Sequence, residues 1–208
     1  MTLFPGSMSS VLGESIIGRA AKKGAVEINC VQIRDYTENK QMQVDDYPYG
    51  GGWGLIMMAQ PLKSCLDDIM AKAGKRRSRV IYMSPQGKPF NQQEAKRLRR
   101  DYDHLVLVCG HYEGIDERFI EECVDEEISL GDFVLTGGEI AAMAVADCVC
   151  RMVPGSPTRS ATPARATGTA CSSTRSTPAP RSGRAAPCPR CCSPATTPWW
   201  RSGGAKSS

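Results

Sequence analysis

The sequence predicts an α/β domain with a largely parallel sheet and helices on both faces, followed by a segment that does not fold. Apolar runs typical of buried strands alternate with segments of helical period up to residue 155. Glycine-bearing turns follow several of these runs, as in open α/β sheets. Residues 156–208 contain no Leu, Ile, Val, Met or Phe. Such a segment cannot bury enough apolar area to offset its chain entropy, so the domain is predicted to end at residue 155.

The first half of the domain begins with the end of a strand. This strand end is predicted at residues 1–5, because a short apolar run leads directly into a Pro-Gly pair. Helical spacing follows over residues 11–24, and residues 25–33 alternate like a strand. Residues 35–53 are polar and glycine-rich, which predicts a loop. Residues 55–73 again have helical spacing, ended by the following glycine.

The second half alternates between strands and helices. Strands are predicted at residues 80–83, 105–109 and 128–135, and Gly131 interrupts the last of them. Helices are predicted at residues 91–100, 115–123 and 138–152. Asn91 is placed to cap the first of these helices, since its side-chain oxygen can accept from free backbone N–H groups.

Charge and cysteine usage favour a reduced, soluble, cytoplasmic protein. Residues 156–208 hold eight of the 26 basic residues and no acid, so residues 1–155 carry 18 basic and 22 acidic side chains. A nucleic-acid site on the mildly acidic domain must therefore be a local patch. Six of the ten cysteines lie in or beside apolar segments of the domain, as buried thiols do. No apolar run reaches the roughly 18 residues of a membrane span.

Three glycine-bearing turns are the candidate ligand site. They follow predicted strands at residues 84–87, 110–114 and 131–139. Glycine lets a backbone approach a ligand closely, and ligands of open α/β sheets bind at such strand ends. None of the turns is a dinucleotide-binding or phosphate-binding loop motif. From spacing alone, three tight turns without a ligand remain an equal alternative.

Four motifs carry a resemblance to a known family. They read VDDYPYGGG from residue 44, YMSPQG from residue 82, CGHYEGIDER from residue 109 and SLGDFVLTGGE from residue 129. In this order they resemble the bacterial tRNA (guanine-N1)-methyltransferases that act at tRNA position 37. The resemblance covers nearly all of residues 2–155. It implies a SPOUT-type parallel sheet with a C-terminal trefoil knot, a homodimer, S-adenosyl-L-methionine as methyl donor and tRNA as substrate.

The resemblance also implies a set of cofactor contacts, because the family binds its methyl donor among the three turns. Transferred motif by motif, the predicted cofactor-binding residues are Tyr82, Ser84, Pro85, Gly110, Leu130, Gly131, Asp132, Phe133, Val134, Leu135 and Gly137. Backbone groups would read the adenine edge, while Leu130 and Leu135 would flank the ring.

The chemistry requires a general base for the guanine N1 proton and a cation or N–H donor near O6. In the family the base is an Asp beyond the knot, and an Arg helps to hold the guanine. Arg151 matches that Arg, although a helix C-terminal cation is the structural alternative. Glu113 matches the acidic position beside the cofactor and would bind the guanine or a Mg²⁺ ion. The sequence itself offers no metal site, and His111 stands where Arg is more frequent in the family.

Two basic clusters are the candidates for tRNA contact. Phosphate neutralisation by such residues would make binding depend on salt. For the second cluster, a solvated face without function is nearly as good an interpretation. The clusters are Lys72, Lys75, Arg76, Arg77 and Arg79, and Lys96, Arg97, Arg99 and Arg100.

Residues 156–208 stand where the family continues into the catalytic Asp and a tRNA-binding domain. The hypothesis is that they are the same gene translated out of frame, since synonymous codons allow peptides resembling the family's C-terminal segments. A basic disordered arm for tRNA, or a cysteine zinc site, is a weaker alternative. The predicted consequence is an impaired enzyme. A non-catalytic S-adenosylmethionine-binding dimer and an unstable fragment are the alternatives.

Overall fold

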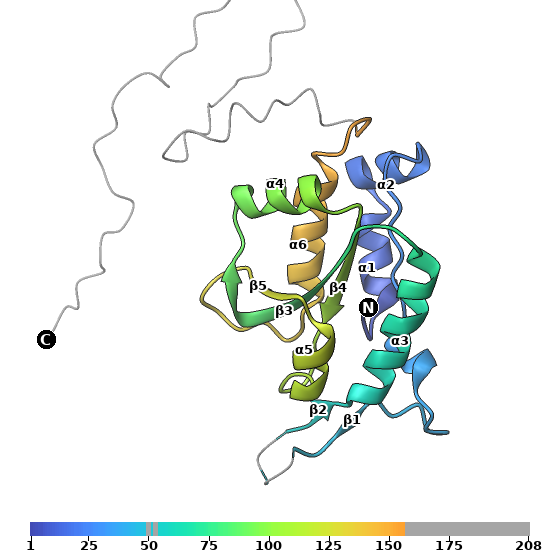
Figure 1. Cartoon of the computed structure of the whole chain (residues 1–208), viewed down its shortest axis with the longest axis vertical. Coiled ribbons are helices and arrows are strands. Elements are labelled where there is room, and N and C mark those ends of the chain that lie inside the picture. The colour runs from blue at the N-terminus through green and yellow to red at the C-terminus, as the bar shows by residue number, and fades with distance from the viewer. Residues whose placement is uncertain (49–50, 52–53, 157–208) are drawn as a thin grey trace, which may run out of the picture. The chain divides into compact units, whose positions relative to one another are not determined.

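A three-stranded parallel sheet forms the centre of the domain, which confirms the predicted α/β class (Figure 1). The computed structural model describes residues 1–48, 51 and 54–156, so the predicted out-of-frame tail lies outside the described residues except for Ser156. The strands are β3 (Ser78–Pro89), β4 (His104–Cys109) and β5 (Glu126–Ser129), in the order β4-β3-β5.

The N-terminal residues extend this sheet beyond β4. The amino group of Met1 donates to the carbonyl of Leu107 at 2.9 Å, and the N–H of Cys109 donates to the carbonyl of Met1 at 3.0 Å. On its other side Thr2 forms a parallel bridge to Gln32. The strands predicted at residues 1–5 and 25–33 are therefore wrong in length. Each of these segments contributes only one residue to β pairing, in the bridge between Thr2 and Gln32. Pro5 ends the first segment, since its fixed φ suits the first turn of a helix.

The helix predicted at residues 11–24 is two helices, α1 (Pro5–Leu12) and α2 (Ser15–Lys22). They pack tightly where they meet, and an added Cβ on Gly18 would lie 1.9 Å from the carbonyl oxygen of Gly13. Only glycine fits there, so the two helices meet through backbone.

The predicted loop at residues 35–53 contains short regular pieces. A 3₁₀ helix (Ile33–Tyr36) opens it, and β1 (Asp45–Asp46) pairs antiparallel with β2 (Ile56–Met57). Helix α3 (Ala59–Ala73) consequently begins four residues later than predicted, because residues 56–57 pair as a strand. It ends before Gly74, as predicted, and this glycine has a φ of +62°.

The remaining helices lie close to their predicted positions: α4 (Gln92–Asp101), α5 (Glu117–Cys123) and α6 (Glu139–Cys150). Asn91 caps α4 as expected, since its Oδ1 accepts from the N–H of Gln93 at 2.8 Å and of Glu94 at 3.1 Å. Across the described ranges, the helices fall short of the length and apolar character that a membrane span requires.

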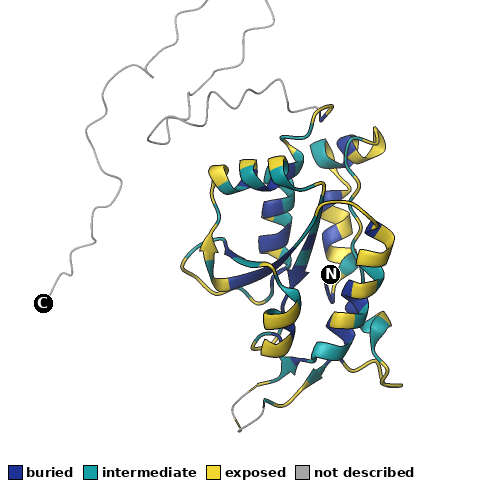
Figure 2. Ribbon diagram, in the orientation of Figure 1, coloured by how far each residue is buried: buried dark blue, intermediate teal, exposed yellow. Residues whose placement is uncertain are grey.

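Two apolar cores cover the two faces of the sheet (Figure 2). Side chains alternate along β3, so Val80 and Tyr82 join one core and Ile81 and Met83 join the other. The first core packs α3 and α5 against the sheet, and the second packs α1, α4 and α6. This arrangement confirms the prediction of helices on both faces. The trefoil knot stays a prediction.

Strands β3 and β5 pair in two separate pieces. Met83 and Lys88 both lie opposite Ile128, so residues 84–87 are excluded from the ladder and project from it. Gly87 crosses β5 so closely that an added Cβ would lie 2.6 Å from the Ile128 nitrogen. The strand predicted at residues 128–135 is wrong beyond Ser129, because the Ser129 hydroxyl hydrogen-bonds within its own turn, to the Gly131 carbonyl, at 2.9 Å.

The close crossing gives a first prediction. Gly87→Ala should lower the free energy of unfolding by about 1–3 kcal/mol, because backbone atoms of β5 must move to admit the methyl group. Urea unfolding measures the change. Gly6→Ala is the matched control, since an added Cβ there meets nothing within 4 Å and alanine suits helix α1. A Gly87→Ala protein as stable as the control would show that this crossing is not tight.

Candidate functional site

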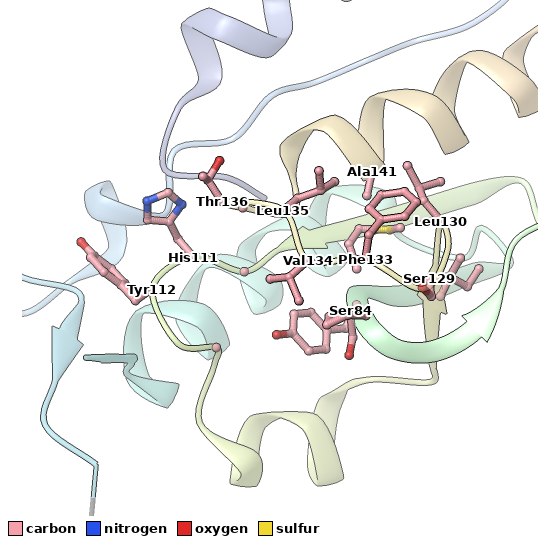
Figure 3. A pocket seen from close by; sticks show the side chains of 18 of the residues that line it. Ser84, His111, Tyr112, Ser129, Leu130, Phe133, Val134, Leu135, Thr136 and Ala141 are labelled. Carbon is pink, nitrogen blue, oxygen red and sulfur yellow. The ribbon is translucent and has the colours of Figure 1, made fainter. Parts of the chain in front are cut away.

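A cavity lies at the carboxyl ends of β4 and β5 and at the break within β3, where three turns converge (Figure 3). The first turn contributes Ser84 and Pro85, and the second contributes residues 110–114. The end of β5 and the third turn contribute residues 128–130 and 133–138. Most of the wall from the third turn is apolar, with Leu130, Phe133, Val134 and Leu135 in Figure 3. The cavity therefore combines apolar walls with backbone groups from glycine-bearing turns.

Two of these turns are joined directly to each other. The N–H of Gly138 donates to the carbonyl of Gly110 at 2.9 Å. An added Cβ on Gly138 would lie 2.9 Å from the Cα of Cys109, so the start of α6 touches the end of β4 through backbone. Thr2 secures the same corner, because its hydroxyl donates to Glu139 at 2.8 Å. The N-terminus thus supports one wall of the cavity.

The turn at residues 110–114 has a strained backbone. Tyr112 has a φ of +58°, a conformation that L-residues other than glycine rarely adopt. The turn is held by the N–H of Gly114, which donates to the carbonyl of His111 at 3.2 Å, and by the N–H of Glu113, which donates to the carbonyl of Leu55 at 3.0 Å. Strain of this kind at a cavity wall is a feature of functional sites.

Tyr82 is a buried phenol beside the second turn. Burial, together with the negative charges of Glu127 and Glu117, raises the pKa of Tyr82 to about 12. An added Cβ on Gly110 would lie 2.9 Å from the Tyr82 ring and hydroxyl, so glycine is needed for the ring to lie against the turn. The phenol stays protonated at neutral pH and can donate a hydrogen bond to a ligand.

The structure brings together nine of the eleven residues predicted to bind a cofactor. Gly131 and Asp132 are the two that do not line the cavity. Gly131 lies behind Phe133, since an added Cβ would lie 2.6 Å from that ring, and Asp132 is exposed. The nine that line it are Tyr82, Ser84, Pro85, Gly110, Leu130, Phe133, Val134, Leu135 and Gly137.

Sequence reasoning missed other lining residues, among them His111, Thr136, Gly138 and Ala141. Three of these lie inside the quoted motifs, so extending each contact set to its whole turn would have found them. Ala141 is different, because it reaches the cavity from the first turn of α6. Helical periodicity marks that residue only as part of the apolar core.

The two predicted catalytic residues occupy different places. Glu113 lines the cavity, and an added Cβ on Gly54 would lie 2.3 Å from its Cγ. Arg151 does not line the cavity. It is the C-terminal cap of α6, whereas Gly138 at the opposite end of that helix lines the cavity. At about 1.5 Å per residue, the rise along α6 from Ala141, which lines the cavity, to Arg151 is about 15 Å.

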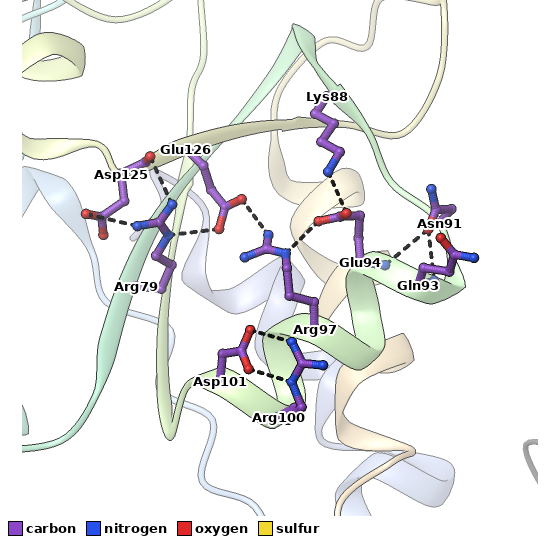
Figure 4. Close-up of polar contacts among 10 residues, drawn as sticks. All are labelled: Arg79, Lys88, Asn91, Gln93, Glu94, Arg97, Arg100, Asp101, Asp125 and Glu126. Carbon is purple, nitrogen blue, oxygen red and sulfur yellow. Dashed lines mark hydrogen bonds and ion pairs between the residues drawn. The ribbon is translucent and has the colours of Figure 1, made fainter.

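Most of the predicted tRNA-binding cations form ion pairs, and Figure 4 shows those of Arg79, Arg97 and Arg100. Arg77 pairs with Asp103 at 2.8 Å, Arg79 with Glu126 at 2.9 Å, and Arg100 with Asp101 at 2.6 Å. Lys72 and Arg97 are paired as well. Within the described ranges, the members of the two clusters that form no ion pair are Lys75, Lys96 and Arg99.

Over residues 1–48, 51 and 54–156, the His, Cys, Asp and Glu side chains form no group of three that could hold a metal ion. All six cysteines in these ranges are free thiols. Burial raises the pKa of the Cys109 thiol to about 12 and that of Cys65 to about 11, so neither is a reactive thiolate at neutral pH.

Comparison with known proteins identifies the family. Residues 1–165 match the profile described as tRNA (Guanine-1)-methyltransferase TrmD. The chain belongs to this family. Among curated relatives, the tRNA (guanine-N(1)-)-methyltransferase of Ruminiclostridium cellulolyticum is 56% identical over 155 residues, which is 74% of this chain and 66% of the relative. The protein of the same name from Alkaliphilus oremlandii is 53% identical, over 74% of this chain and 64% of the relative.

The matches to the tRNA (guanine-1)-methyltransferase family contain the whole cavity. All three turns lie inside the profile match. A Bacillus cereus relative is 49% identical over 155 residues, 74% of this chain. The matched segment spans only 63–66% of these three relatives. Family membership therefore covers the domain that holds the cavity.

The buried phenol predicts a dependence of stability on high pH. The folded protein holds the Tyr82 proton more tightly than the unfolded chain, because its pKa is raised from 10.0 to about 12. This contribution to the free energy of unfolding is complete below pH 10 and is lost as the pH rises towards about 12. Urea unfolding over this range should show a shallower decline for Tyr82→Phe.

Tyr36 serves as the comparison, because its hydrogen bond to Asp68 and burial raise its pKa to about 12 as well. Tyr36→Phe should also reduce the decline, and the double variant should reduce it further. If Tyr82→Phe followed the wild-type curve, the phenol would not be desolvated in solution.

Proposed function

We propose that the domain binds S-adenosyl-L-methionine in the three-turn cavity and belongs to an enzyme that methylates N1 of guanosine 37 in tRNA. The observation that carries this proposal is the cavity itself, which the family motifs build from three turns distant in sequence. The names of the relatives support the reaction.

The lining residues fit an adenosyl group attached to a charged side chain. Leu130, Leu135 and Ala141 offer apolar surface for a flat ring. Gly110 and Gly137 have no Cβ, so a ligand can come close enough to form hydrogen bonds with their backbone groups. Ser84 and Tyr82 add hydroxyl groups at the edge. When bound, S-adenosylmethionine supplies an activated methyl group on a sulfonium.

In the proposed reaction, the protein must position the guanine and a base must remove its N1 proton. Holding the methyl donor and guanine N1 in line makes the transfer an effectively unimolecular step within one complex. Glu113, on the cavity wall, can accept hydrogen bonds from the N–H groups of a guanine edge. Glu113 would also be the carboxylate that holds a Mg²⁺ ion, if the reaction uses one.

The last segment of the sequence, residues 156–208, has no carboxylate side chain that could serve as the general base. Residues 156–208 contain no Asp or Glu, so the segment cannot supply the carboxylate that the family uses. We therefore propose that this chain binds the methyl donor but transfers the methyl group slowly. The segment's out-of-frame origin remains part of this hypothesis.

A homodimer is the proposed assembly, and a cytoplasmic location suits a tRNA-modifying domain with free thiols. Phe4 and Val11 on the α1 side, and Ile140 at the start of α6, are large apolar side chains exposed to solvent. Helices α1 and α6 are in contact, so these residues lie on neighbouring elements. Because Arg151 lies at the far end of α6 from the cavity, it would act on guanine in the cavity of a second copy.

Cofactor binding is tested by thermal unfolding. S-adenosylmethionine should raise the wild-type midpoint, since a ligand that binds only the native state stabilises it. Gly110→Ala should weaken binding about tenfold or more, because the new methyl group forces the Tyr82 ring into the cavity. Gly6→Ala is the control and should bind as the wild type does. No midpoint shift in the wild type would refute the proposed cavity ligand.

Methyl transfer is tested with unmodified tRNA and mass spectrometry of its nucleosides. The expected result is cofactor binding with little or no 1-methylguanosine, because the family base is not supplied by residues 156–208. Transfer at the rate of a family member would refute the impairment. Neither binding nor transfer, with a low unfolding midpoint, would favour an unstable fragment.

A further inference from the structure

A chain of alternating charges lies outside the cavity and links β3, α4 and β5 (Figure 4). Glu126 accepts from Arg79 at 2.9 Å through one oxygen and from Arg97 at 2.6 Å through the other. Glu94 accepts from Arg97 at 2.8 Å and from Lys88 at 2.6 Å. Both oxygens of each carboxylate are therefore used, and Arg97 is the link between the two.

The centre of this chain is largely shielded from water. The side chains of Glu94 and Glu126 are 12% and 17% exposed, and that of Arg97 is 26% exposed. Partly buried pairs are screened less than surface pairs, and loss of one partner leaves the others without compensation. Arg97 consequently holds two carboxylates in fixed positions, one on its own helix and one on β5.

Lys88 and Glu126 of this network lie on the strand segments that adjoin two of the cavity turns, where β3 and β5 pair as Lys88 with Ile128 and Pro89 with Ser129. Lys88 is the first residue after residues 84–87, which are excluded from the β3–β5 ladder. Glu126 begins β5 and Ser129 ends it, immediately before the third turn. Ser84 and Ser129 both line the cavity. The charged chain thus connects the bases of two cavity walls through α4.

We propose that Arg97 is a positioning residue that sets the spacing of residues 84–87 and 129–131, and through it the affinity of the cavity for its ligand. The ligand part of this inference rests on the proposed function. Arg97 is too remote to touch the ligand, because it does not line the cavity. Its role is to fix the separation of two walls.

Arg100 provides a matched control on the same helix. It pairs with Asp101 at 2.6 Å, and these side chains are 76% and 36% exposed. No bond from this pair reaches β3 or β5 in Figure 4. Arg97→Met and Arg100→Met remove the same charge from neighbouring turns of α4, so they separate the network from a general effect of charge.

The first measurement is hydrogen exchange in the protein without ligand. Arg97→Met should accelerate exchange in residues 84–87 and 129–131, while Arg100→Met should leave both segments unchanged. Lys88→Met is the milder variant, since Lys88 is exposed and is the last residue in the series of ion pairs. It should affect residues 84–87 alone. Unchanged exchange in Arg97→Met, or equal acceleration in Arg100→Met, would overturn the proposal.

The second measurement is calorimetric titration with S-adenosylmethionine. Arg97→Met should raise Kd about tenfold, within the range found for residues that act on a site from outside it. Arg97→Lys should recover part of the affinity, and Glu126→Gln should be non-additive with Arg97→Met because both act through one pair. If the wild type fails to bind, the proposed function fails, and hydrogen exchange alone still decides the role of Arg97. If the wild type binds and Arg97→Met binds equally well, Arg97 has only a structural role.

Discussion

The split pairing of β3 with β5 is the constraint on which the rest of the domain depends. Residues 84–87 leave the ladder because Met83 and Lys88 share one partner on β5. The strand can return only because Gly87 passes within van der Waals distance of the β5 backbone. This crossing places one turn over the ends of the other strands. Without it, β3 would continue as regular strand and the cavity would lose a wall.

Backbone contacts and charges divide the task of holding the cavity. Glycines bring the second and third turns into direct contact, through Gly138 and Gly110. In the first turn Gly87 lies against the β5 backbone, and we propose that the charges anchored on α4 add to this contact. The same cations are already paired with carboxylates, so they add less net positive charge to a surface for RNA phosphates. Basic residues in a sequence are therefore a poor guide to a nucleic-acid surface until their partners are known.

Local signals predicted the second half of the chain well and the first half less well. The cap at Asn91 and the strand β4 depend on neighbouring residues, and both were predicted. Residues 1–33 form two short helices and one bridge, because Met1 and Thr2 bond to segments about 30 and 106 residues away. The prediction of a strand beyond Ser129 was also wrong, since the Ser129 hydroxyl donates to the Gly131 carbonyl and the chain turns there.

The sequence by itself determined the fold class, the family and the set of turns that form the cavity. These follow from apolar periodicity and from motifs that are contiguous in the chain. Only the tertiary structure decided which residues face the cavity, that Arg151 lies at the wrong end of α6 to reach it, and which cations are already paired. The physical reason is that the orientation of a side chain towards the cavity, its distance from it and its ion pairs depend on residues far apart in sequence. No local pattern encodes them.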